Sequence, residues 1–204
     1  MRERHLENRR KSGILGLAGV ILFVLAFVIL GNLNSEFNFK EDFISKLGAL
    51  GESNAIWWNL IGFVLVGSLQ IGFGISYGKI LKDKLAGFLL ALFGVGLIFT
   101  SVPIDIGDSN TPISKVHIVA ICFALAFWLF GLSRISYNTA NKKSIRNRAN
   151  IAAILIVTSM IGFVIGFWSM PITHRMVFII VFGWTAITSI GLLISDKRQI
   201  SSKH

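Results

Sequence analysis

The chain has few charges, few acids, three prolines and only one cysteine. Only 15% of its 204 residues are charged, against roughly 25% in soluble domains, while 53% are hydrophobic. A single cysteine, Cys122, excludes an intrachain disulfide and a cysteine-based metal framework. Ten acids against 20 lysines and arginines leave a net charge of +10. This balance excludes an ordinary soluble domain and is typical of an integral membrane protein.

Uncharged apolar runs long enough to cross a bilayer recur along the chain. A hydrocarbon core about 30 Å thick requires roughly 20 helical residues. We therefore predict an all-α, polytopic membrane helix bundle with six transmembrane helices. Its parts are a basic cytoplasmic segment at 1–12, a transmembrane domain at 13–195 and a cytoplasmic tail at 196–204. The six runs are Gly13–Leu33, Ala55–Gly78, Leu85–Ile104, Val116–Ser133, Ile151–Met170 and Met176–Ser195.

The first run follows the basic stretch MRERHLENRRK, which looks like the start of a signal peptide. Its apolar part is too long for one, and no small-residue cleavage site follows it. We interpret it as an uncleaved signal anchor. Since the loops leave no room for a soluble domain and no internal repeat is visible, the chain is expected to form one bundle.

Positive charge is concentrated on one side of the predicted membrane. All but four of the 20 lysines and arginines lie in the N-terminus, the second and fourth loops and the tail. Because cytoplasmic loops retain positive charge, we predict a multi-pass cell-membrane protein with both termini cytoplasmic. The basic stretch NKKSIRNR lacks interleaved aromatic residues, so we predict no nucleic-acid partner. The four other cations are Lys40, Lys46, Lys115 and Arg175.

The predicted outer side has a different chemistry. It carries six of the ten acids, all three prolines and the longest loop. In that loop, helical spacing of four apolar residues predicts a short amphipathic helix in the outer interface. These residues are Phe39, Phe43, Leu47 and Leu50.

Small residues mark the faces on which the helices should pack. In lipid, glycine and alanine let backbones approach closely, and polar side chains bond across helices. The second run carries Gly67, Gln70, Gly74 and Gly78 on one stripe, and the third carries Gly87, Ala91 and Gly94. The stripes of the third and fourth runs end at Asp105 and His117. We therefore expect both side chains to point into the bundle.

Several short motifs fit one known pattern. They are ISKLGALGE after the first run, VP closing the third, HIVAICF opening the fourth, and an arginine followed nine residues later by Trp184. From Ile44 to Leu193 the chain resembles domain-of-unknown-function family 998, small six-helix membrane proteins of bacteria and archaea. The resemblance implies the topology and no activity. His174 departs from it, since Glu or Gln is expected there. The resemblance implies that the family positions in this chain are Ser45, Leu47, Gly48, Asn59, Pro103, His117 and Arg175.

The turn SVPIDIGDSNTPISKVHIVA returns the chain to the surface from which it came. Neighbouring helices pack about 8–10 Å apart, so Asp105 and His117 are expected to meet directly or through one water. Arg175 opens the sixth run on the same surface. We therefore predict an outer polar pocket roofed by the Ser45 segment. Its binding residues would be Asp105, His117, Arg175, Ser45 and Asn59.

Three interpretations of His117 stay open: a hydrogen-bonded interfacial histidine, a binding or proton-relay residue, and a metal ligand. A zinc site needs three or four ligands, which Asp105, His117 and His174 could supply with Ser45 nearby. No HxxxH or HExxH pair is present. We predict no cofactor, with zinc as the alternative.

The function stays open between different classes. The first is a non-catalytic membrane protein that binds a lipid headgroup or small solute, or scaffolds a partner, through the outer pocket. The second is a metal-dependent membrane hydrolase acting on lipid. A small transporter is a third, although Gln70 and hydroxyls are the only polar groups expected at mid-membrane depth. Membrane lipid is the predicted partner, with a membrane protein or a second copy as further options.

Overall fold

The computed structural model describes residues 2–201, and the side chains of residues 6–194. These residues form no strand, so the all-α prediction is confirmed. Residues 202–204 of the predicted tail lie outside the described part. The elements are α1 (Arg2–Leu33), the 3₁₀ turn η1 (Ile44–Gly48), α2 (Ala55–Trp58), the π-helical stretch η2 (Asn59–Leu65), α3 (Val66–Leu81), α4 (Lys84–Phe99), α5 (Pro112–Tyr137), α6 (Lys143–Val164) and α7 (Met170–Ser201).

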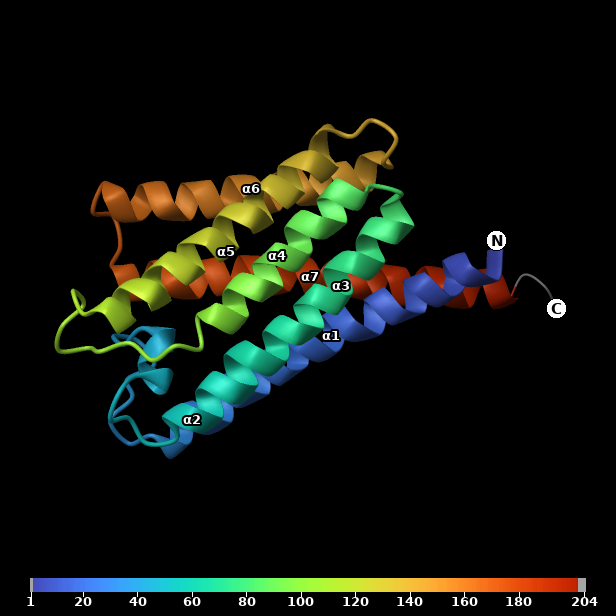
Figure 1. The fold of residues 1–204 in the computed structure, drawn as a ribbon. Coiled ribbons are helices and arrows are strands. Elements are labelled where there is room, and N and C mark those ends of the chain that lie inside the picture. Colours follow the sequence, from blue (N-terminus) through green and yellow to red (C-terminus); the bar gives the residue numbers. More distant parts are fainter. Residues whose placement is uncertain (1, 202–204) are drawn as a thin grey trace.

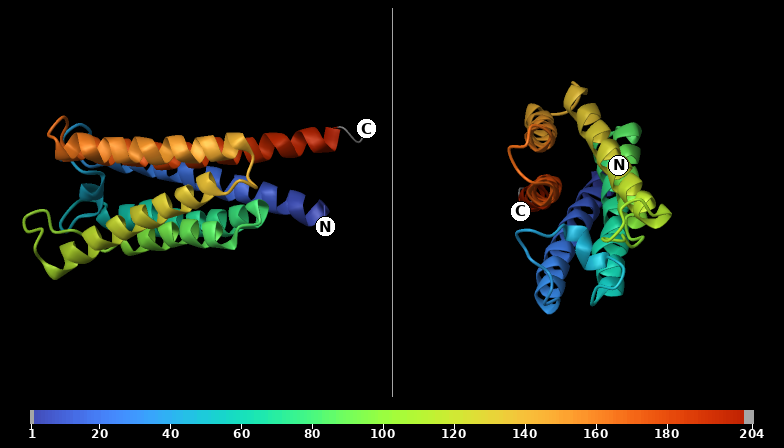
Figure 2. Two further views of the ribbon diagram at one scale, coloured as in Figure 1. Left: turned by 90° about the horizontal axis from the view of Figure 1, so that it is seen from above. Right: turned by 90° about the vertical axis from the view of Figure 1, so that its left-hand side faces the viewer.

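The long helices form a closed ring. α1 contacts α3, each helix from α3 to α7 contacts the next one along the chain, and α7 returns to α1. The end-on view in Figure 2 shows this arrangement. The connections alternate between two ends (Figure 1). We call the end at which α1 begins and α7 ends, with the α3–α4 turn and the α5–α6 loop, the basic end, and the opposite end the cap end.

Five helical segments are long and apolar enough to span a membrane. Their outward faces are apolar as well: Phe123 is 57% exposed, Ile179 70% and Val164 79%. A helix facing water would carry polar residues there, whereas lipid favours such a surface. The chain is therefore an integral membrane protein. The five segments are Leu6–Leu33, Ala55–Leu81, Pro112–Tyr137, Lys143–Val164 and Met170–Ile194.

The predicted third span is shorter than expected. The run Leu85–Ile104 forms a helix only to Phe99, and the 16 residues of α4 extend roughly 24 Å, less than a hydrocarbon core of about 30 Å. Its far end stops before Pro103, because a proline disfavours helical backbone in the residue before it. Its near end is fixed by Asp83, whose carboxylate accepts a hydrogen bond from the Ala86 N–H at 3.1 Å.

Helices α3 and α4 pack with their backbones almost in contact, as the glycine stripes predicted. Three of the four glycines of α3 face a small residue of α4 so closely that no side chain fits between them. A Cβ on Gly78 would lie 2.5 Å from the Cα of Gly87, one on Gly74 2.7 Å from the Ala91 nitrogen, and one on Gly67 2.6 Å from the Gly94 oxygen.

Aromatic side chains fill the middle of the ring. Trp184 of α7 contacts Phe73, Tyr77 and Trp128 with ring centroids 5.8–6.1 Å apart, which ties α7 to α3 and α5. Gln70 is 2% exposed, but it does not share the α4-facing stripe as predicted. Its side chain instead lies beside Gly19 of α1. The interior is thus closely packed and rich in aromatic rings, and its buried polar groups include Gln70 and hydroxyls such as those of Ser76, Ser159 and Thr185.

Candidate functional site

Residues 34–54 fold over one end of the ring, and we call this segment the cap. The Asn34 amide donates a hydrogen bond to the Glu52 carboxylate at 2.6 Å, which joins the two ends of the cap. The Leu50 N–H donates to the Ile104 oxygen at 2.9 Å, which joins it to the α4–α5 loop. The cap is therefore a fixed part of the fold.

An ion pair stiffens the middle of the cap. The Lys46 ammonium lies 2.8 Å from the Asp42 carboxylate and also donates to the Glu36 oxygen at 2.9 Å. The hydrogen bond to Asp42 raises the pKa of Lys46 above its usual value. Burial raises the pKa of Asp42, but hydrogen bonds from Lys46 and the Asn38 N–H outweigh burial and lower it. Both groups are therefore charged at neutral pH.

The structure has a 3₁₀ turn at Ile44–Gly48 where the spacing predicted an amphipathic α-helix. Ile44 and Leu47 are 2% and 1% exposed, so this turn points inward. Leu50, expected on the same apolar face, is 53% exposed. Burial of the turn against the ring therefore decides its shape, because a continuous helix would turn Leu50 to the same side as Leu47.

The Ser-x-Leu-Gly motif, residues 45–48 of the stretch ISKLGALGE, joins the cap to the second span. The Asn59 side-chain amide donates to the Gly48 oxygen at 2.9 Å. A Cβ on Gly48 would collide with the Asn59 carbonyl oxygen and lie 2.8 Å from the Trp58 ring. Only glycine fits here. Ser45 lies in the same turn, half-buried, and its hydroxyl makes no hydrogen bond with another described residue.

Arg175 ties α7 to the cap. Its guanidinium donates to the Pro171 oxygen at 2.7 Å and to the Asp42 oxygen at 2.8 Å. The neighbouring His174 ring lies 5.2 Å from the Phe43 ring, and its Nδ1 is buried without a hydrogen bond. Both residues of α7 therefore face the cap, and Arg175 directs donors at backbone carbonyls.

Asp105 and His117 both lie at the cap end, but each bonds to backbone. The Asp105 carboxylate accepts hydrogen bonds from the N–H groups of Gly107 at 2.9 Å and Asp108 at 3.3 Å. His117 is 4% exposed, and its Nδ1 lies 2.8 Å from the Val102 oxygen. Since a carbonyl only accepts, Nδ1 carries the proton. No hydrogen bond joins the Asp105 and His117 side chains of the described structure.

The same turn holds the start of α5. The Asp105 N–H donates to the Ser114 hydroxyl oxygen at 3.0 Å, and Thr111 caps the helix by accepting from the Ser114 N–H at 3.2 Å. Pro112 occupies the first turn, where its missing N–H costs nothing. Within residues 2–201, no three His, Cys, Asp or Glu side chains are grouped to hold a metal ion. Asp105, His117 and His174 thus form no such group.

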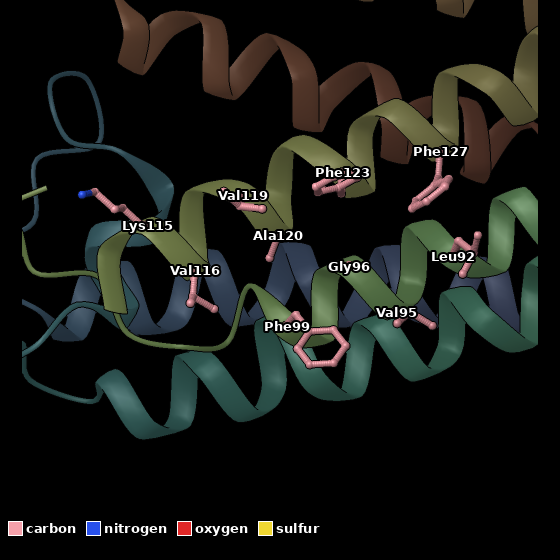
Figure 3. A pocket seen from close by; sticks show the side chains of 10 residues that line it. All are labelled: Leu92, Val95, Gly96, Phe99, Lys115, Val116, Val119, Ala120, Phe123 and Phe127. Carbon is pink, nitrogen blue, oxygen red and sulfur yellow. The ribbon is translucent and has the colours of Figure 1, made fainter. Parts of the chain in front are cut away.

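An apolar groove of about 420 Å³ lies between α4 and α5 (Figure 3). The helices meet at Gly96, where a Cβ would lie 2.5 Å from the Cβ of Ala124. Lys115 is its one charged residue and lies at the cap end of the row, while Phe127 lies at the other. The remaining lining consists of Leu92, Val95, Gly96, Phe99, Val116, Val119, Ala120 and Phe123.

Sequence reasoning counted Lys115 only as a topological charge. It lies exposed in the first turn of α5, and its ammonium forms no ion pair or hydrogen bond with another described residue. The available signal was its position: an outer cation at the end of an apolar helix. Which helix face it shares with the groove depends on how α4 and α5 pack, and one sequence does not show this.

Comparison with known proteins agrees with the motifs. The family described as "Protein of unknown function (DUF998)" matches residues 17–194. The chain belongs to this family, as the Ser-x-Leu-Gly, His117 and Arg175 positions indicated. No curated protein and no solved structure matches the chain.

Proposed function

We propose that the protein binds a phospholipid without catalysis, with an acyl chain in the α4–α5 groove and the phosphate at Lys115. One observation carries this proposal: an apolar groove that ends at an unpaired cation. A phospholipid has the complementary form, an apolar chain joined to an anionic phosphate. Lysine is a common phosphate partner as a compact point charge.

The short α4 helix explains why lipid would settle at this place. α5 has 26 residues against 16 in α4, so α5 continues past the end of its neighbour. Beyond Phe99, where α4 ends, α5 therefore walls the groove on one side only. Phe99 and Val116, which border this part, are 59% and 48% exposed. A lipid chain lying there covers apolar surface that α4 leaves open.

The polar residues predicted to form a pocket take a positioning role in this proposal. His117 bonds to Val102 and Ser114 bonds to Asp105, so the 100–111 loop and the start of α5 are held together. Lys115 lies between these two anchored residues. Because its neighbours on both sides are fixed, the backbone of Lys115 is held at the cap end of the groove, within reach of a phosphate there.

A second apolar cavity, about 310 Å³ between α1 and α7, has Arg175 among its lining residues. Its cation is less suited to a lipid phosphate, because the guanidinium already donates to the Pro171 and Asp42 oxygens. The free ammonium of Lys115 is therefore the better anchor. With both termini cytoplasmic, as the charge bias predicts, the bound lipid would belong to the outer leaflet.

The proposal is tested by the lipid that co-purifies with the full chain, quantified by native mass spectrometry after extraction from phosphatidylglycerol vesicles. Lys115→Gln should lower lipid occupancy roughly tenfold, the effect of one charge-assisted contact. Val119→Trp should also lower it by filling the groove. Lys40→Gln and Ile118→Trp are matched controls, since both residues are exposed but lie outside the groove lining.

Unchanged occupancy in both Lys115→Gln and Val119→Trp would exclude the groove as the site. Release of free fatty acid from the vesicles by purified protein, lost on metal chelation, would instead support a lipid hydrolase and contradict non-catalytic binding.

A further inference from the structure

The basic end contains another cavity, larger than both the α4–α5 groove and the α1–α7 cavity, which the proposed function does not use. It has a volume of about 670 Å³ and lies among α1, α3, the α5–α6 loop, α6 and α7. Its charged lining consists of four cations, Arg9, Lys82, Lys142 and Arg148, and contains no carboxylate. Positive charge from distant parts of the sequence thus meets around one space.

Among the side chains of residues 6–194, no carboxylate forms an ion pair with these four cations. The two ion pairs of the described residues involve Lys46 and Arg134. Asp83, on the turn next to Lys82, is 5% exposed and accepts hydrogen bonds from Arg134 at 2.9 Å and Asn138 at 3.0 Å. Its carboxylate is therefore engaged by Arg134 and Asn138 and forms no ion pair with the four cavity cations.

The two arginines in the cavity wall are poorly satisfied. Arg148 donates only to the backbone oxygens of Ser144 and Ile187, at 3.3 and 3.5 Å. The Nε of Arg9 is buried without any hydrogen-bond partner. Since guanidinium N–H groups normally have acceptors, an anion beside these two side chains would supply acceptors that the described residues do not.

Two further features favour a negative ligand. The first N–H groups of a helix have no partner within it, and the 22-residue helix α6 begins at this cavity, where the Lys142 side chain does not cap it. Tyr77 and Thr188 add hydroxyl groups to the lining. Four like charges around one cavity repel one another, and an anion between them removes that repulsion.

We propose that this cavity binds the phosphate group of a phosphate ester, either an anionic lipid headgroup or a soluble compound. Arg9 and Arg148 contact the phosphate from the wall, where both are half-buried, and Lys82 and Lys142 attract it from the exposed rim. The organic part of the ligand lies against the apolar lining residues. These are Ile80, Leu81, Ile145 and Leu192.

The test uses the full chain in neutral detergent, titrated with short-chain phosphatidic acid, with inorganic phosphate and with phosphatidylcholine as the zwitterionic reference. Affinity is measured by isothermal titration calorimetry at two salt concentrations. Arg9→Gln/Arg148→Gln should weaken phosphate binding roughly tenfold or more, because charge-assisted contacts to a phosphate are lost. Arg10→Gln/Lys143→Gln removes the same charge at the same end, outside this lining, and should change affinity less than twofold.

Binding of phosphatidic acid alone would support a lipid headgroup as the ligand, and binding of inorganic phosphate as well would support a site open to water. Equal loss in the two double variants would overturn the proposal, since attraction to the whole basic end would then explain binding. Absence of binding by every phosphate probe, or equal affinity for phosphatidylcholine, would also overturn it.

A variant at the exposed rim covers the case in which the wall variant does not fold. Lys82→Gln/Lys142→Gln leaves the packed interior unchanged and should weaken phosphate binding several-fold, with a smaller salt dependence. Unaltered binding in this variant would equally refute the site.

Discussion

Replacing Gly74 by alanine tests the α3–α4 contact with one methyl group. The new Cβ would lie 2.7 Å from the Ala91 nitrogen and 2.8 Å from the Leu90 carbonyl carbon. Both are backbone atoms, so relief requires that a whole helix shifts. Overpacking of this kind costs about 1–3 kcal/mol, while the better helix propensity of alanine returns about 1 kcal/mol. The free energy of unfolding should therefore fall by up to about 2 kcal/mol.

Gly183→Ala is the matched control, because it makes the same change in the interior of α7. Apart from the adjoining backbone of α7 itself, no atom lies within 4 Å of a Cβ at Gly183, so only the propensity gain applies. The propensity contribution cancels between the two variants and leaves the overlap at α4. Thermal unfolding in detergent, followed by circular dichroism, should rank Gly183→Ala above the wild type and Gly74→Ala below it. A Gly74→Ala midpoint equal to or above that of Gly183→Ala would refute the close packing of α3 on α4.

Two further predictions concern Asp83 and the orientation in the membrane. Burial raises the Asp83 pKa, but hydrogen bonds from Ala86, Asn138 and Arg134 outweigh burial and lower it below 3.8. The ionised Asp83 carboxylate therefore stabilises the fold above pH 3.8, and this stabilisation is lost as the pH falls through the lower pKa of the folded state. Asp83→Asn should lower the unfolding temperature at pH 7 and reduce its change with pH in the acid range. An unfolding temperature that falls with acid as steeply as in the wild type would contradict this. In a Cys122→Ser background, Ser53→Cys should react with an impermeant maleimide on intact cells and Thr139→Cys only after permeabilisation; the reverse pattern would invert the predicted topology.

The helices and their closest contact were predictable because lipid imposes strict requirements on sequence. A span needs a long uncharged run, and close backbone approach needs small residues at helical spacing. Both signals are local, so Gly74 and Gly78 could be assigned to a packing face without a structure. The direction of the Gln70 side chain, towards α1, could not be predicted. Residues at three- and four-residue spacing cover a wide arc of the helix surface, and two neighbouring helices, α1 and α4, contact that arc.

The features that were missed depend on contacts between distant segments. α4 ends at Phe99 although the apolar run continues, because the chain must turn before Pro103 to meet the cap. The turn at Leu47 is buried by the ring, which overrides its helical spacing. Arg9 and Arg148 lie 139 residues apart in the sequence, and their meeting at one cavity follows only from the ring in which α1, α6 and α7 adjoin.

The family positions have a common physical role at the cap end. Gly48 and Asn59 clamp the cap, His117 holds the α4–α5 loop, and Arg175 joins the cap to α7, in each case through a backbone carbonyl. Side chains that satisfy buried backbone groups are costly to replace, since each loss leaves an unpaired acceptor. These four residues thus hold the cap and the neighbouring α4–α5 loop in place. Residues that bind a ligand must keep unused donors, and the two proposals therefore rest on Lys115 and on the four cations that line the basic-end cavity.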